Sequence, residues 1–221
     1  MSASGNGSGA ERAVGGRDLG TAATLKVMSR TSLALASLLM ATTIAACGSS
    51  IPVVSFDPAS PCTTDGRQPG AYPDLEASLP AAYDGRTPDN VDSGRSCTPG
   101  ALGSLAERGV TELRFAGATW GLGGTTGLTV AVFEATGLDA TAMVDFYATS
   151  AQANRKTEKL QLSDTTAGAL PARRLDVLQS DGAYQTIVAW PAGDEGRVMV
   201  LLAADLGDTK VAAAVEGFAA P

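Results

Sequence analysis

Hydrophobic residues recur at helical spacing in three segments of the chain. The first begins at Thr98, whose hydroxyl can cap a helix and which precedes a proline, and it ends at Gly109. The second runs from the capping residue Asp139 to about Asn154. Its predicted buried face comprises Met143, Phe146, Tyr147 and Ser150. A third helix is predicted to begin at Asp208. Its apolar stripe is formed by Val211, Val215 and Phe218.

Strand patterns occupy six further segments. Apolar and polar residues alternate over 110–120, and residues 127–135 are apolar on both faces, which predicts a strand inside a sheet. The other four segments lie around Leu160 and Leu162 and over residues 172–179, 184–190 and 197–203. Because strands follow one another without intervening helices, we expect an α+β fold. The predicted architecture is an antiparallel β-sheet of about six strands covered by two or three helices.

The segment before this domain is rich in proline. Eight of the eleven prolines lie between Pro52 and Pro99. Because proline fixes φ and cannot donate a backbone hydrogen bond, residues 47–73 are predicted to form an extended tether. Residues 74–221 are then expected to fold as a single globular α+β domain.

An uncharged segment, residues 31–46, precedes the tether. Lys26 and Arg30 stand just before it and small residues end it, which is the order of a secretory signal peptide. Its 16 residues are fewer than the about 20 that a transmembrane helix needs. Because the lack of charge continues to Phe56, an uncleaved membrane anchor stays an alternative, as does an ordinary buried helix.

The end of that segment resembles the lipobox of bacterial lipoproteins. Ile44, Ala45 and Ala46 precede Cys47, which matches the pattern of an aliphatic residue, two small residues and a cysteine. The resemblance implies that residues 1–46 are a cleaved signal peptide and that Cys47 is the lipidated first residue of the mature chain. It also implies a lipid-anchored location at the extracytoplasmic face of the cell membrane.

A compact version of this signal begins at Met28. The 27 residues before it are rich in glycine, alanine and serine. Residues 28–47 alone have the basic start, apolar middle and small-residue end of a lipoprotein signal. We therefore expect translation to start at Met28.

The chain contains three cysteines, Cys47, Cys62 and Cys97. Lipidation of Cys47 leaves an even pair outside the cytoplasm, where disulfides persist. We therefore predict a disulfide between Cys62 and Cys97. Two free buried thiols are the alternative.

Charge and the absence of histidine narrow the classes of function. The formal charge is −7 overall, and residues 1–46 contain four basic and two acidic residues, so the remainder has 12 basic and 21 acidic residues, or −9. Such a charge opposes nucleic-acid binding. The chain has no histidine, which excludes Ser-His-Asp and Cys-His catalysis and histidine metal sites. We expect a non-enzymatic protein without a cofactor.

Four polar motifs could have a chemical function, and each can also be explained by a purely structural role. Residues 120–127 (WGLGGTTG) lack the following helix and the Gly-Lys-Ser/Thr ending of a phosphate loop, so a hairpin loop is favoured. Residues 89–94 (DNVDSG) offer oxygen ligands for Ca²⁺ but lack EF-hand spacing. Asp194 and Glu195 fit a solvated turn, and Glu134 fits a strand end that faces water. No residue is therefore predicted to be catalytic, cofactor-binding or metal-binding.

The order of helices and strands from residue 98 onward resembles that of Mog1/PsbP-like domains, which occur in some bacterial lipoproteins. The resemblance implies a binding or assembly-accessory role and specifies no functional residue. We expect a module that binds a protein or an envelope component. The alternatives are a small-ligand carrier, which needs a sizeable apolar cavity, and a carboxylate-based envelope hydrolase, which needs a cleft with paired acids.

Overall fold

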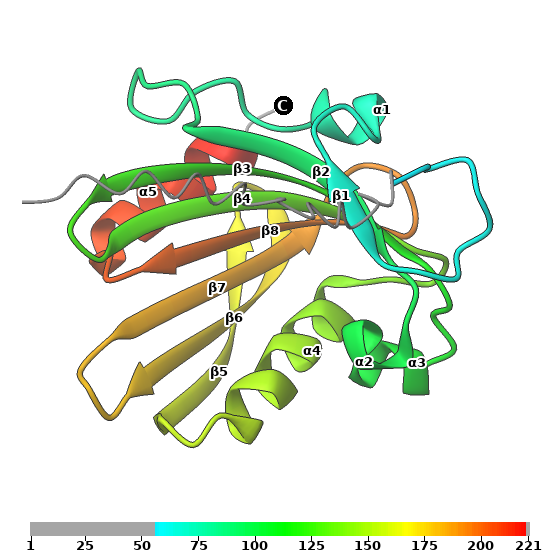
Figure 1. The fold of residues 1–221 in the computed structure, drawn as a ribbon. Helices are drawn as coiled ribbons and strands as arrows, with labels where there is room; N and C mark the ends of the chain where they lie inside the picture. Colours follow the sequence, from blue (N-terminus) through cyan, green and yellow to red (C-terminus); the bar gives the residue numbers. More distant parts are fainter. Residues whose placement is uncertain (1–55, 220–221) are drawn as a thin grey trace, which may run out of the picture. The chain divides into compact units, whose positions relative to one another are not determined.

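One antiparallel β-sheet organises residues 56–219, the part of the chain that the computed structural model describes. The strand order is β1-β2-β3-β4-β8-β7-β6-β5, and every neighbouring pair is antiparallel (Figure 1). The strands are β1 (Gly66–Gln68), β2 (Asn90–Ser96), β3 (Leu113–Gly123), β4 (Thr126–Glu134), β5 (Thr157–Ala167), β6 (Leu170–Gln179), β7 (Tyr184–Pro191) and β8 (Arg197–Ala204). The helices are α1 (Pro73–Glu76), α2 (Pro99–Leu102), α3 (Ser104–Glu107), α4 (Ala140–Ala153) and α5 (Asp208–Ala219).

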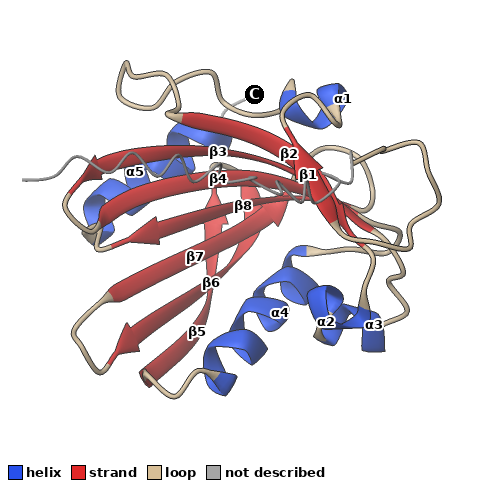
Figure 2. Ribbon diagram, in the orientation of Figure 1, coloured by secondary structure: helices blue, strands red, loops and turns tan. Residues whose placement is uncertain are grey.

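Apolar side chains are buried on both faces of the sheet, and helices lie on each face (Figure 2). On one face, α1 and α5 pack on a core that includes Trp120, Val130, Val188 and Leu201. On the other face, α4 packs on β6 and β7, with α2 and α3 beside it, over a core that includes Leu175, Ile187 and Val200. The central strands are therefore apolar on both faces, as predicted for residues 127–135.

The α+β class and the antiparallel sheet are confirmed, but the predicted count of about six strands is wrong, since the described residues form eight. The additional strands are the short β1 and the polar β2. In β2, the buried positions include Ser93 and Arg95, so hydrophobic alternation gives no signal there. Its strand conformation comes instead from pairing with β3 along its whole length.

The helix predicted over residues 98–109 is two short helices. Thr98 caps α2 as predicted, because its hydroxyl accepts a hydrogen bond from the Ala101 amide at 3.3 Å. Gly103 then separates α2 from α3 with a φ of 50°, a conformation that favours glycine. Among the described residues there are accordingly five helices in place of the expected two or three, three of them a single turn long.

The helix predicted from Asp139 to Asn154 is confirmed as α4. The Asp139 carboxylate accepts a hydrogen bond from the Ala142 amide at 2.7 Å and so caps the helix. Of the predicted buried face of α4, Met143 is buried and Phe146 and Tyr147 are half-buried, but Ser150 is exposed, and the other fully buried positions are alanines and Val144. Burial on this face also raises the pKa of the Tyr147 hydroxyl.

Candidate functional site

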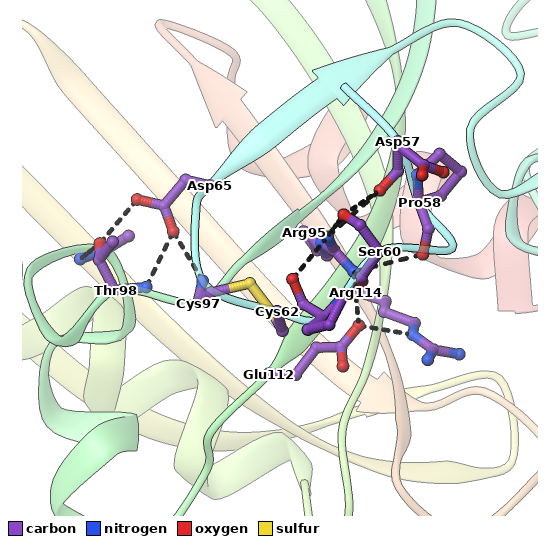
Figure 3. The surroundings of a disulfide bond; sticks show 12 residues. Asp57, Pro58, Ser60, Cys62, Asp65, Arg95, Cys97, Thr98, Glu112 and Arg114 are labelled. Carbon is purple, nitrogen blue, oxygen red and sulfur yellow. Dashed lines mark hydrogen bonds and ion pairs between the residues drawn. A yellow bond between two sulfur atoms is a disulfide. The ribbon is translucent and has the colours of Figure 1, made fainter. Parts of the chain in front are cut away.

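Residues 56–65, which we call the strap, are held against the end of β2 (Figure 3). The sequence pattern placed these residues in the tether. A disulfide joins Cys62 of the strap to Cys97, the residue after β2, with the two Cα atoms 5.4 Å apart. The predicted disulfide is therefore confirmed. It ties the first described residues covalently to the sheet.

Arg95, on β2, holds the strap from beneath. Its side chain is only 3% exposed, and its guanidinium donates hydrogen bonds to the carbonyls of Ser60 at 2.7 Å and Pro58 at 3.2 Å. A third goes to the carbonyl of Asp57 at 3.2 Å, and the Phe56 ring lies 5.5 Å from the guanidinium carbon. A buried cation is costly unless its donors are satisfied. The strap supplies acceptors for both terminal nitrogens, whereas the buried Nε has no partner among the described residues, so the arginine depends on the strap for its hydrogen bonds.

Two glycines allow this close approach. A Cβ at Gly94 would overlap the Gly66 carbonyl and the Arg67 backbone, and a Cβ at Gly66 would overlap the Phe56 ring. A side chain at Gly94 would therefore push β1 away from β2, whereas a side chain at Gly66 would displace the Phe56 ring from its place over β1.

Asp65 fastens the end of the strap to the start of α2. Its carboxylate accepts hydrogen bonds from the Thr98 hydroxyl at 2.6 Å and from the amides of Cys97 at 2.6 Å and Thr98 at 2.9 Å. The hydroxyl bond and then the two amide bonds stabilise the charged form and lower the pKa of Asp65 from its usual value.

A row of charged residues crosses four strands at the same end of the sheet. Arg95, Arg114, Glu134 and Arg197 are cross-strand neighbours on β2, β3, β4 and β8. The Arg197 Nε donates a hydrogen bond to Glu134 at 2.6 Å, and Glu112 lies 3.0 Å from Arg114 and 3.9 Å from Arg95. Arg95 and Arg114 are like charges in opposed positions, and Glu112 lies between them, so the row and Glu112 together form a network of ion pairs.

A polar hollow of about 460 Å³ lies beside this row. Glu112, Arg114, Glu134 and Glu195 are among its lining residues. Glu112 and Glu134 thus line one hollow, as the hydrolase alternative requires. Each carboxylate nevertheless contacts an arginine of the network. The arrangement is that of a charge-paired surface, and Glu134 stands at a strand end as predicted.

A second hollow, of about 610 Å³, lies between α5 and the loop before β2. Tyr83 and Phe218 line it, with their ring centroids 5.8 Å apart. The buried Trp120 stacks on Phe218 from the core side, with ring centroids 6.1 Å apart. The charged residues of the lining are Asp84 and Lys210. This aromatic hollow has the composition of a small-molecule site, since it combines apolar rings with a few charged groups.

The structure does not bring the carboxylates of residues 89–94 together. Asp89 accepts a hydrogen bond from the Gly121 amide at 2.7 Å, whereas Asp92 lies 3.6 Å from Arg67. Within residues 56–219, no group of three or more histidine, cysteine or acidic side chains is arranged to hold a metal ion. Both aspartates have structural contacts.

The other two motifs are turns. Residues 120–127 span the end of β3, the β3–β4 turn and the start of β4, with Gly123 and Gly124 at positive φ, as expected for a hairpin. Asp194 and Glu195 lie in the turn between β7 and β8. Both structural interpretations agree with the structure.

Cys47, the predicted lipidation site, lies outside the described residues. Within those residues no helix combines the length and the apolar character needed to cross a membrane. Comparisons with protein families, with curated proteins and with solved structures found no match for this chain. A functional interpretation therefore rests on the motifs and the geometry described above.

Proposed function

We propose that the protein is a lipid-anchored binding module at the extracytoplasmic face of a membrane. In this proposal Cys47 carries the lipid, and the folded domain binds a protein or an envelope component without catalysing a reaction. The observation that carries the proposal is the strap, which is fixed to the sheet by the Cys62–Cys97 disulfide. A disulfide of this kind persists in an exported protein and is rare in the cytoplasm.

The strap begins close to the proposed anchor. Eight residues, 48–55, separate Cys47 from Phe56. Fully extended, they span at most about 30 Å. Because Arg95 and the disulfide hold the strap against β2, a lipid on Cys47 would keep the domain near the headgroups. A net charge of −9 after residue 46 opposes close association with anionic lipids, so the domain would present its surfaces to other molecules.

The polar hollow supports binding over hydrolysis. A carboxylate-based hydrolase uses one carboxyl group as a general acid and a second as a base or nucleophile. Glu112 and Glu134 instead each contact a guanidinium, Glu112 with Arg114 at 3.0 Å and Glu134 with Arg197 at 2.6 Å. The Glu134–Arg197 contact joins β4 to β8, whereas the Glu112–Arg114 contact lies within one segment, and both suit a structural role.

Metabolic labelling with radioactive palmitate tests the anchor. We expect wild-type protein and a Cys62→Ser variant to be labelled and membrane-bound, because both keep Cys47. A Cys47→Ala variant should be unlabelled and either unprocessed or released. Equal labelling of Cys47→Ala and wild type would overturn the lipidation site.

The aromatic hollow favours a second candidate function, the carriage of a small apolar ligand. Trp120 reports on this hollow because its ring stacks on Phe218, and a Trp190→Phe variant leaves it as the single tryptophan. We expect anilinonaphthalene sulfonate to quench Trp120 emission in that variant with saturation. An additional Phe218→Asp change should abolish the quenching. Unchanged emission across the titration would rule out the carrier function for this probe class.

A further inference from the structure

The two edges of the sheet differ in length and in protection. β1 forms one edge with three residues, whereas β5 forms the other with eleven. β5 pairs with β6 on one side only. Among the described residues, no hydrogen bond reaches the backbone groups of residues 158–167 from the outer side. β5 therefore presents a row of free donors and acceptors of the kind that accepts a further strand.

Two exposed apolar side chains lie on the β5–β6 hairpin, on opposite faces of the sheet. Of the described residues, two large hydrophobic side chains are exposed. They are Leu162 on β5, at 41% exposure, and Leu170 on β6, at 38%. Natural edges are usually short, charged or interrupted by proline. Residues 160–167 of β5 contain one charged residue, Asp164, and it is paired with Arg173. Residues 160–167 of β5 therefore have little protection against pairing with another strand.

A hollow of about 490 Å³ lies beside this edge. Leu162 forms one wall, and Ala148, Thr149 and Gln152 of α4 form another. Alternate side chains of an added strand point to the same face of a sheet. An added strand would therefore direct every second side chain toward the hollow, while its backbone paired with β5.

We propose that the β5 edge binds an extended segment of another protein, which adds to the sheet as a further strand and places an apolar side chain in the hollow beside Leu162. The inference rests on the proposed function as a binding module and specifies the kind of partner. Backbone hydrogen bonds supply affinity in this mode of binding, and the hollow supplies selectivity.

Charge indicates that the bound segment is basic. At the hollow, Arg108 is already paired with Asp145 at 2.6 Å, whereas Glu107 forms no ion pair with a described residue. Glu158 at the start of β5 also forms none within residues 56–219. Arg155 and Lys159 at the same end of β5 form none either among the described residues, so the preference for a basic segment rests on Glu107 at the hollow and on the domain's net charge of −9.

A second copy of the chain fits this edge poorly. Two domains of charge −9 repel each other. The favoured occupant is therefore a segment of a different, basic protein.

Synthetic peptides test the proposal with the full chain in detergent micelles. The probe is a fluorescein-labelled, acetylated eight-residue peptide of alternating valine and lysine. One control peptide has every second backbone amide methylated, and another has glutamate in place of lysine. We expect fluorescence polarisation to show saturable binding of the probe and at least about tenfold weaker binding of both controls. Equal binding of the methylated peptide would overturn strand addition, and equal binding of the glutamate peptide would overturn the basic partner.

Hydrogen exchange and two matched variants locate the bound peptide. The probe should slow amide exchange in residues 158–167 and leave the aromatic hollow unchanged. Leu162→Lys should weaken binding about tenfold, because it adds a like charge at the hollow. Leu170→Lys makes the same change outside the hollow and should keep wild-type affinity. Protection elsewhere, equal effects of the two variants, or no saturable binding would overturn the site.

The anchor can be tested separately from this edge. Cys47→Ala should bind the probe with wild-type affinity, since the proposed peptide site is formed by β5 and α4 and does not include Cys47. A failure of palmitate labelling therefore leaves the peptide result interpretable, and a failure of peptide binding leaves the lipid anchor standing.

Discussion

The two ends of the sheet are stabilised by different means. At the β1 end, the strap is held by the Cys62–Cys97 disulfide, by the carbonyl contacts of Arg95 and by the hydrogen bonds of Asp65. At the β5 end, no cross-link is present in the described residues, and the strands are held by a long hairpin and by packing under α4. Directional contacts thus replace hydrophobic packing where apolar residues are few.

The buried positions of the two ends show why this division arises. Ser93 of β2 is fully buried, accepts a hydrogen bond from the Tyr72 amide at 2.8 Å and donates one to Glu76 at 2.7 Å. The fully buried side chains of the C-terminal strands are mostly apolar, such as Leu175 and Leu201, with Thr186 as the polar exception, whose hydroxyl donates to Asp176 at 2.7 Å. Polar groups stabilise a buried site only when their partners are in place. The β1 end is therefore more vulnerable to single changes in polar residues.

Among the changes proposed here, removal of the disulfide should lower the stability of the β1 end the most. The Cys62→Ser, Cys97→Ser double variant removes the cross-link between two residues that are 35 positions apart in the sequence. We expect the free energy of unfolding to fall by about 3–4 kcal/mol in the chain-entropy model. Urea denaturation measures the loss, and amide exchange should increase first in β1 and β2. Equal acceleration in β5 and β6 would contradict the independence of the two ends.

Replacement of the buried arginine should have the next largest effect. Arg95→Met removes the donors that hold the carbonyls of the strap, and we expect a loss of about 2–3 kcal/mol. Limited proteolysis should then cut within residues 56–61. Arg86→Met is the matched control, since Arg86 is exposed and lies beyond the strap. The proposed role of Arg95 is wrong if both variants resist proteolysis equally.

Acid should weaken the strap through Asp65. The pKa of Asp65 in the folded protein lies below its usual value near 3.8. Its contribution to stability is therefore fully present above about pH 4 and is lost as the pH falls through the lowered pKa. Asp65→Asn should remove part of the stability loss between pH 4 and pH 2, by less than about 1 kcal/mol because the group is exposed. Denaturation midpoints across that range, compared with wild type, measure the difference.

Substitution at the β5 edge should have the smallest effect on stability. Leu162 is 41% exposed. Leu162→Thr keeps a strand-forming residue, so we expect a change of less than about 0.5 kcal/mol in the free energy of unfolding. A loss above about 2 kcal/mol in urea denaturation would show that Leu162 belongs to the core, and would weaken the case for an open docking edge.

Sequence patterns predicted the segments whose apolar residues face the core. The strand at residues 127–135 and the helix capped by Asp139 both appear within about one residue of their predicted bounds. The disulfide followed from cysteine parity once Cys47 was assigned to lipid. The β2 strand was missed, because its buried serine and arginine carry no hydrophobic periodicity.

The candidate sites were harder to predict. The aromatic hollow joins Tyr83, Trp120 and Phe218, which are distant in sequence and share no local motif. Arg95 gave one weak signal, an arginine at an inward position of a polar segment. The hydrogen-bond partners of Arg95 are backbone carbonyls, which every residue has. The amino-acid sequence alone therefore could not identify them.

By itself, the sequence determined the α+β class, most of the strands and helices and the pair of cysteines available for a disulfide, because local periodicity and residue counts carry that information. It also supplied the proposed anchor at Cys47, the feature closest to the membrane in our proposal. The tertiary structure decided the strap, the eight-strand order and which edge stays open. Those features depend on backbone groups meeting across long separations, and backbone groups are the same in every residue except proline.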